Sequence, residues 1–278
     1  MILSVRHRTT FTYSDDIADT AMEVRLRPLD REPQRLLSYE LRLEPRGAVR
    51  AYRDVFGNWV ETYNHRAPHR RIVVEARSVV ETGSGSSGGE EPSPGERFRL
   101  LRHDGPVMDV PWVRETAARF GDRPVEPSLL SDLTGLIHQR FVYEPNVTAV
   151  ASTVADLVEL GRGVCQDFAH AWIAVCRALW VPARYVSGYL YTGETRQPQA
   201  SHAWAEAWLP GWGWLAHDPT NPSGGVDECY VRVAVGRDYR DVPPTRGVFR
   251  GAATETLEVD VRVEQTAAPS TTPSPMSS

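Results

Sequence analysis

The first 81 residues alternate between apolar and polar side chains, which is the period of a half-buried β-strand. Residues 54–61 place Gly57 and Asn58 between apolar flanks, a pair typical of a hairpin turn. Several strands with turns at short intervals predict an antiparallel, sandwich-like β domain over residues 1–81. The alternation is clearest in three segments, residues 2–14, 35–45 and 70–81.

Two segments lack the apolar side chains that a folded core needs. Residues 82–96 consist almost entirely of Gly, Ser, Pro and acidic residues, which predicts a flexible linker. Residues 265–278 have a similar Pro-, Ser- and Thr-rich composition, and we expect a disordered tail there.

Between about residues 108 and 180 the period becomes helical. Apolar residues stand three and four apart in residues 110–120 and 127–141. Thr153 and Asp156 have the spacing of a capping box ahead of a further helix. After residue 181 the alternation of strands returns, at residues 183–191, 202–209, 213–218 and 230–236.

Helices followed by strands, rather than alternating with them, predict an α+β domain over residues 97–250. Residues 257–264 alternate cleanly within a last segment, 251–264, which could rejoin the N-terminal sheet. The predicted order is therefore an N-terminal β domain, a linker, an α+β core, a C-terminal strand and a tail.

Composition excludes several classes of protein. A hydrophobic content of 41% and a mean hydropathy of -0.38 are typical of a soluble globular chain. A net charge of -5 and a pI of about 5.9 argue against a nucleic-acid partner. There is no signal-like N-terminus or membrane-length apolar run, and the cysteines number only three, so we expect a cytoplasmic protein without a membrane partner. Its oligomeric state is left open.

Cys165 lies in the segment GRGVCQDFAHAW, which reads as a glycine-rich turn followed by an apolar helix. The cysteine falls in the first turn of that helix. Unpaired backbone N–H groups and the positive end of the helix dipole stabilise a thiolate at this position. Cys165 is therefore a candidate nucleophile.

His202 and Asp218 are the candidate base and its orienting acid. They lie at opposite ends of a predicted hairpin, residues 202–218. If the loop is centred on Pro210, each residue is eight positions from the centre and His202 faces Asp218 across the two strands. Cysteine, histidine and aspartate in this arrangement form a nucleophile, a base and its orienter.

The other cysteines and histidines are weaker candidates. Cys176 is 11 residues along the same helix, about 16 Å from Cys165 at 1.5 Å per residue, and its neighbours are apolar. Cys229 lies in a polar loop, His170 is on another helix face, and His217 is expected on the opposite strand face from Asp218. No metal-ligand spacing or phosphate-binding glycine loop is present, so we predict neither a metal nor a cofactor.

The segments GVCQDFAHAW, PARYVSGY, SHAWAEAWLP and HDPTN resemble the transglutaminase core superfamily. VRLRPLD, DVFGNWV and AVGRDYRDVPPTRGV are similar to its bacterial transglutaminase-like members with a β-rich N-terminal region. The resemblance implies a papain-like core, in which a helix carrying the nucleophile packs on an antiparallel sheet. It also implies Cys165 as nucleophile, His202 as acid and base, and Asp218 as orienter.

The resemblance further implies acyl transfer through a thioester, with a peptide or protein as substrate. The backbone N–H of Cys165 is the natural first oxyanion donor, and Tyr143 or Gln166 is a candidate for the second. Hydrolysis by a cysteine protease and glutamine–amine transfer both remain open. Because the chain contains no lysine, it could not cross-link itself through lysine side chains. The alternative is a catalytically silent binding or assembly module.

Overall fold

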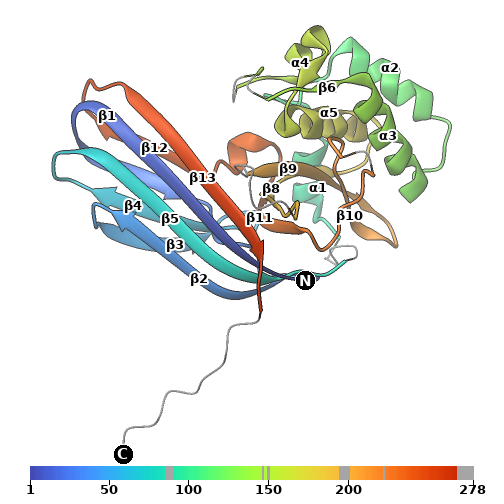
Figure 1. The fold of residues 1–278 in the computed structure, drawn as a ribbon. Coiled ribbons are helices and arrows are strands. Elements are labelled where there is room, and N and C mark those ends of the chain that lie inside the picture. Colours follow the sequence, from blue (N-terminus) through green and yellow to red (C-terminus); the bar gives the residue numbers. More distant parts are fainter. Residues whose placement is uncertain (85–90, 146, 149–150, 194–200, 222, 268–278) are drawn as a thin grey trace, which may run out of the picture.

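The protein has two lobes that lie side by side, one built of β-strands and one of helices around a smaller sheet (Figure 1). The computed structural model describes residues 1–84, 91–145, 147–148, 151–193, 201–221 and 223–267. The predicted α+β class is confirmed, and nearly all strand pairs are antiparallel. Within the described residues, no helix is long and apolar enough to span a bilayer.

The β lobe is organised by one long, bent strand, β1 (Ile2–Val24). The first part of β1 pairs with β5 and β13, and its last part pairs with β4 and β12. The register shifts between Thr12 and Ile17, so the strand changes direction there and curls the seven-stranded sheet. The other strands are β2 (Arg35–Glu44), β3 (Ala48–Arg53), β4 (Trp59–His65), β5 (His69–Glu81), β12 (Thr245–Arg250) and β13 (Glu255–Gln265).

Two strands from the C-terminal end of the chain complete this sheet. The β13 strand pairs with β1 over eleven consecutive residues, from Leu3–Gln265 to Tyr13–Glu255. The β12 strand also pairs with β1, so the α+β core ends before Thr245 rather than at residue 250. A short alternating strand does not reveal in its own sequence which sheet it joins, and this is why the predicted boundary was too late.

The second lobe packs helices against a four-stranded antiparallel sheet of order β10-β9-β8-β11. The central helix α5 runs from Cys165 to Ala178, and every residue from Gln166 to Arg177 is buried. The sheet strands are β8 (Ala183–Leu190), β9 (His202–Leu209), β10 (Gly213–His217) and β11 (Tyr230–Gly236). The remaining elements are α1 (Pro94–Leu101), α2 (Pro111–Phe120), α3 (Pro127–Arg140), β6 (Val142–Tyr143), α4 (Val154–Leu160), β7 (Arg162–Gly163) and the short 3₁₀ helix η1 (Tyr239–Asp241).

Helix caps explain where α1 and α4 begin. The predicted capping box of α4 is confirmed, since Thr153 and Asp156 bond each other's backbone N–H groups. Ser93 and Glu96 form the same motif at α1. Helix α1 therefore takes in the last residues of the predicted 82–96 linker. Residues 85–90 of that linker and residues 268–278 of the predicted tail lie outside the described part of the chain.

Polar side chains of the β lobe cover the free edge of β11. The Gln34 amide accepts from the backbone N–H of Arg232 at 2.8 Å and donates to its carbonyl at 2.9 Å. Asn58, in the predicted hairpin turn, does the same at Val235, with distances of 2.8 and 2.7 Å. Each amide takes the place of a neighbouring strand, so the edge is covered and the two lobes are held in register.

Candidate active site

Cys165 is the first residue of α5 and is partly exposed. The helix begins here because the Asp167 carboxylate accepts the backbone N–H of Val164 at 2.8 Å. Gly163 permits this close approach, since a Cβ at that position would stand 2.7 Å from the Asp167 carboxylate. Gly161 has a left-handed conformation, φ +70°, and ends α4. These glycines thus set the entry to the helix that carries Cys165.

His202 opens β9, and its ring bonds to Asp218. The distance from His202 Nε2 to Asp218 Oδ2 is 2.7 Å, and the Asp218 side chain is fully buried. The thiol of Cys165 also bonds the His202 side chain. The three side chains predicted from the sequence therefore lie together in one hydrogen-bonded row.

The hairpin register differs from the predicted one. Leu209 pairs with Gly213 and Trp208 with Trp214, so the loop is centred on Gly211, one residue later than expected. Gly211 and Gly213 both have positive φ, +78° and +76°, which allows this three-residue loop. The β9–β10 pairs end at Ala205–His217, so Asp218 is not paired with His202 across the hairpin; on its other side His202 pairs with Gly188 of β8. The carboxylate still reaches the imidazole, because a shift of two residues keeps the same strand face.

Two further residues hold the Asp218 carboxylate in place. Thr220 donates to Oδ1 through both its backbone N–H, at 2.9 Å, and its hydroxyl, at 2.6 Å. Tyr230 donates its hydroxyl to Oδ2 at 2.9 Å. The Thr220 contact belongs to the Asp-Pro-Thr turn and could have been read from the sequence. Tyr230 could not, because it comes from β11, twelve residues further along.

These contacts set the charge of the site. Burial disfavours a charge on His202, but hydrogen bonds to Asp218 and Cys165, together with the charges of those groups, raise the pKa of His202 to about 10. Burial likewise opposes ionisation of Asp218, but bonds from His202 and Thr220 hold its pKa below the ordinary value. An imidazolium bonded to the Asp218 carboxylate is therefore favoured around neutral pH.

Aromatic rings pack against the imidazole of His202. Trp204 stacks on His202 with ring centroids 6.2 Å apart, and Tyr230 lies 6.0 Å away. Trp204, Trp208 and Trp214 are all buried, so these three tryptophans pack inside the lobe. Trp212 lies in the hairpin loop and is 59% exposed.

The weaker candidates lie away from this row. His170 is fully buried with a pKa lowered by burial to about 3, and its Nε2 accepts the backbone N–H of Tyr239. Burial lowers the pKa of His217 to about 4, and its ring bonds Thr134. Cys176 is buried in the core, which raises its pKa well above normal. Cys229 is partly exposed, and burial and Asp227 raise its pKa.

The two candidates for a second oxyanion donor occupy different surroundings. Tyr143 is 50% exposed on β6, which pairs with β7 immediately before α5. Its pKa is raised by burial and then by the charges of Cys165 and Asp218, so its hydroxyl stays protonated and able to donate. Gln166 is buried on α5. No cluster of three or more His, Cys, Asp or Glu side chains suited to a metal is found among the described residues.

Two family models match the chain on either side of the linker. A model described as the bacterial transglutaminase-like N-terminal region matches residues 3–81. The model of the transglutaminase-like superfamily matches residues 115–219, which contain Cys165, His202 and Asp218. A Mycobacterium leprae protein of uncharacterized function is 34% identical over 290 residues, covering 95% of this chain and 99% of that protein.

The chain belongs to the transglutaminase-like superfamily.

Two further proteins are similar to this chain, one in sequence over part of its length and one in fold over nearly all of it. A protein-glutamine gamma-glutamyltransferase of Pseudomonas aeruginosa is 30% identical over 164 residues, covering 54% of this chain and 24% of that protein. The solved structure of a candidate cysteine protease from Cytophaga hutchinsonii superposes with a TM-score of 0.73 at 23% identity. It covers 96% of this chain and 92% of that one, so both lobes of this transglutaminase-like protein share its fold.

Proposed function

We propose that this protein is a cysteine-dependent acyl-transfer enzyme that acts on amide bonds of a peptide or protein through a thioester. The observation that carries the proposal is the row Cys165–His202–Asp218, in which one imidazole bonds both the thiol and a buried carboxylate. A half-buried histidine in a packing role would not need a thiol at a helix N-terminus on one side and a fully bonded carboxylate on the other.

The first half-reaction forms the thioester. The Cys165 thiolate attacks the amide carbonyl carbon, a carbon–sulfur bond forms, and the carbonyl electrons move onto oxygen. As the oxyanion collapses, the carbon–nitrogen bond breaks and His202 gives its proton to the departing amine or ammonia. Asp218 holds the ring throughout and stabilises its charged form.

The second half-reaction releases the acyl group. Water or a primary amine attacks the thioester carbonyl while neutral His202 takes the proton of the nucleophile. The carbon–sulfur bond then breaks, and the thiolate and imidazolium are restored. Water gives hydrolysis, and an amine gives transfer.

The oxyanion needs donors that are already in place. The backbone N–H of Cys165 is one of the unpaired groups of the first turn of α5, and it lies beside the attacked carbonyl. We assign the second donor to the Tyr143 hydroxyl. Burial, and then the charges of Cys165 and Asp218, raise the pKa of Tyr143, so its hydroxyl keeps the proton that it donates.

Trapping the acyl-enzyme tests this function without knowledge of the natural substrate. The protein is incubated with a tryptic peptide mixture, quenched in acid and digested, and the peptide carrying Cys165 is analysed by mass spectrometry. We expect acyl adducts on Cys165 that hydroxylamine removes, and none in the Cys165→Ala variant. Ammonia release together with incorporation of dansylcadaverine would identify transfer, and new peptide N-termini would identify proteolysis. A complete lack of adducts, ammonia and new termini would refute the proposal.

A further inference from the structure

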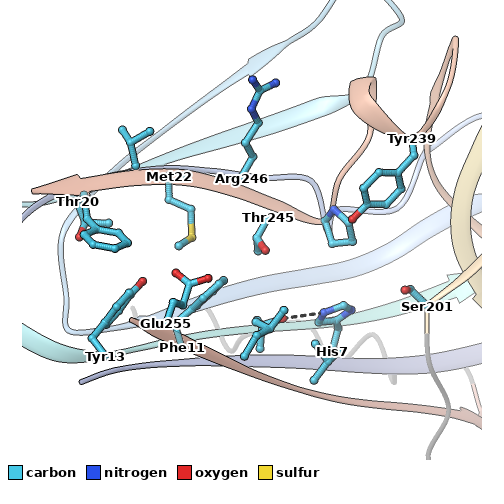
Figure 2. Close-up of a pocket in the computed structure, with 17 residues that line it drawn as sticks. His7, Phe11, Tyr13, Thr20, Met22, Ser201, Tyr239, Thr245, Arg246 and Glu255 are labelled. Carbon is cyan, nitrogen blue, oxygen red and sulfur yellow. Dashed lines mark hydrogen bonds between the residues drawn. The ribbon is translucent and has the colours of Figure 1, made fainter. Parts of the chain in front are cut away.

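A groove runs into the β lobe between β12 and β13, beside the proposed catalytic row. Its volume is about 280 Å³. Figure 2 shows Tyr13, Phe11, Thr20 and Glu255 towards one end, and His7, Tyr239 and Ser201 at the other. The side chains that line its interior are mainly apolar or hydroxyl-bearing, and they include Thr9, Phe11, Met22, Phe249, Leu257 and Val259.

Beside the groove, β12 and the Glu255–Val259 part of β13 each have an edge that no described strand covers. Among the described strands, β12 and β13 each pair only with β1, at its two different halves. Apolar side chains remain uncovered along these edges: Val248 is 71% exposed, Leu257 53% and Val259 50%. Exposed edges of this kind are templates for another strand.

The hydrogen-bond pattern shows which backbone groups of β13 are available. The N–H of Ser14 bonds the carbonyl of Thr254, and the N–H of Thr266 bonds the carbonyl of Ile2. Even-numbered residues at both ends of β13 therefore bond β1, and the register between them is unbroken. Because bonding alternates along an antiparallel pair, the N–H and C=O groups of Leu257 and Val259 point to the free edge. The same two residues place their side chains in the groove.

One end of the groove adjoins the catalytic row. Ser201 lines it and directly precedes His202. Tyr239 also lines it, and its ring packs edge-on against Tyr185, a residue whose pKa is raised by burial and by Cys165. His7 at this end bonds the Tyr189 hydroxyl of β8 at 3.0 Å. This end of the groove therefore lies next to Ser201, which precedes His202, and next to β8, which pairs with the strand that His202 opens.

The dimensions and charge of the groove fit a single extended polypeptide. From His7 to Tyr13 the lining spans six steps along β1, or about 20 Å at roughly 3.3 Å per residue. Burial lowers the pKa of His7 to about 4, so that end is uncharged at neutral pH. Charged side chains that line the groove are Glu255, at the end far from the catalytic row, and Arg246. An occupant of about six residues with uncharged, alternately apolar side chains is favoured.

We propose that this groove binds an extended, apolar segment of the polypeptide substrate, which adds as a strand to the free edge of β13. The bound segment is about six residues long, and it holds the reacting residue that follows its inner end at Cys165. This inference rests on the proposed acyl-transfer function and names its substrate class. A second copy of the chain is the competing occupant. The groove favours a single strand, because its volume holds a few side chains and its inner end lies next to Ser201, the residue before His202.

Hydrogen exchange of β13 amides tests the groove without any turnover. The Cys165→Ala protein is studied by NMR with acetyl-Thr-Val-Thr-Val-Thr-Val-Gln-Gly-amide and with a peptide of reversed order. We expect the amides of Leu257 and Val259 to exchange rapidly in the free protein and at least tenfold more slowly with one of the peptides. The amides of Thr256 and Glu258 serve as internal controls, since they are already bonded to β1. No protection by either peptide at millimolar concentration would overturn the proposal.

Blocking the groove connects binding to catalysis. Val259→Trp fills it, and Glu258→Trp places the same ring on the opposite face of the same strand as a matched control. For wild type we expect kcat/KM to rise as the peptide is lengthened towards eight residues. Val259→Trp should lower the value for the long peptide at least about tenfold and leave a blocked glutamine dipeptide unchanged, whereas Glu258→Trp should affect neither.

The outcomes separate the two proposals. Turnover without length dependence, or equal loss on both substrates, would refute the groove but not the acyl-transfer function. Protection of Leu257 and Val259 without turnover of any peptide would refute the function and leave only a peptide-binding edge. Sedimentation that shows a dimer in wild type and a monomer in Val259→Trp would identify a second copy as the occupant and overturn the substrate proposal.

Discussion

Replacing Cys165 with alanine should lower turnover of any amide substrate by at least about 10⁴-fold, because the group that forms the thioester is gone. The fold should remain, since Cys165 is partly exposed at the first position of α5 and the Asp167 cap is untouched. The free energy of unfolding is expected to change by less than about 1 kcal/mol. Steady-state rates and urea unfolding of the same samples measure both quantities.

Companion variants show whether the loss belongs to a catalytic row. His202→Ala should match Cys165→Ala, and combining the two should cost little more, because the residues act as one unit. Asp218→Asn should retain weaker activity, since Asp218 orients the imidazole and does not transfer the proton. A Cys165→Ala variant that keeps more than a few per cent of wild-type turnover would disprove the role of this thiol.

Replacing Glu206 with glutamine should destabilise the protein by about 3–5 kcal/mol, because it leaves two buried guanidinium groups without a counter-charge. Glu206 is fully buried, and Arg184 bonds its Oε2 with distances of 2.8 and 2.6 Å. Arg232 Nε lies 2.9 Å from its other oxygen. Burial lowers the pKa of Arg184, and Glu206 opposes that shift, so the carboxylate is what keeps the cation in place. For a chain of this size the melting temperature should fall by roughly 10 °C.

Glu40→Gln is the matched control for this prediction. Glu40 pairs with Arg42 on the exposed surface of β2, with both side chains more than half exposed. Its replacement should leave the melting temperature unchanged, because exposed pairs are screened by water. Equal melting temperatures for wild type, Glu206→Gln and Glu40→Gln would mean that the buried arginines find other partners, and that this cluster does not hold β8, β9 and β11 together.

The helices and strands of this fold were easier to predict from the sequence than the strands and side chains that they contact. Helical and strand periods are local, so α5, the hairpin and the α4 capping box could be read directly. The hydrogen bonds from the Gln34 and Asn58 amides to β11 could not be predicted in this way, because they join residues about 180 to 200 positions apart. The return of β12 to β1 was missed for the same reason.

The candidate site also combines features that a local sequence signal predicts with contacts between residues distant in sequence. Cys165 at a helix start and the Asp218 turn are local signals, and the structure brings both residues to His202. The predicted cross-strand register was wrong by two residues, because the conformations of Gly211 and Gly213 set the loop. Tyr230 and Trp204, which support Asp218 and the imidazole, were not predicted in those roles, since only the folded sheet places them there.

The central claim is that Cys165 is activated by His202, and alkylation by iodoacetamide at pH 6 tests it most directly. An ordinary thiol with a pKa of about 8.5 is only about 0.3% thiolate at this pH. Peptide mapping follows Cys165 beside Cys229, whose raised pKa makes it an internal reference in the same chain. We expect Cys165 to be labelled at least about 100-fold faster than Cys229 in the wild type, and to lose this advantage in His202→Ala. Labelling of Cys165 no faster than Cys229 in the wild type would contradict the account.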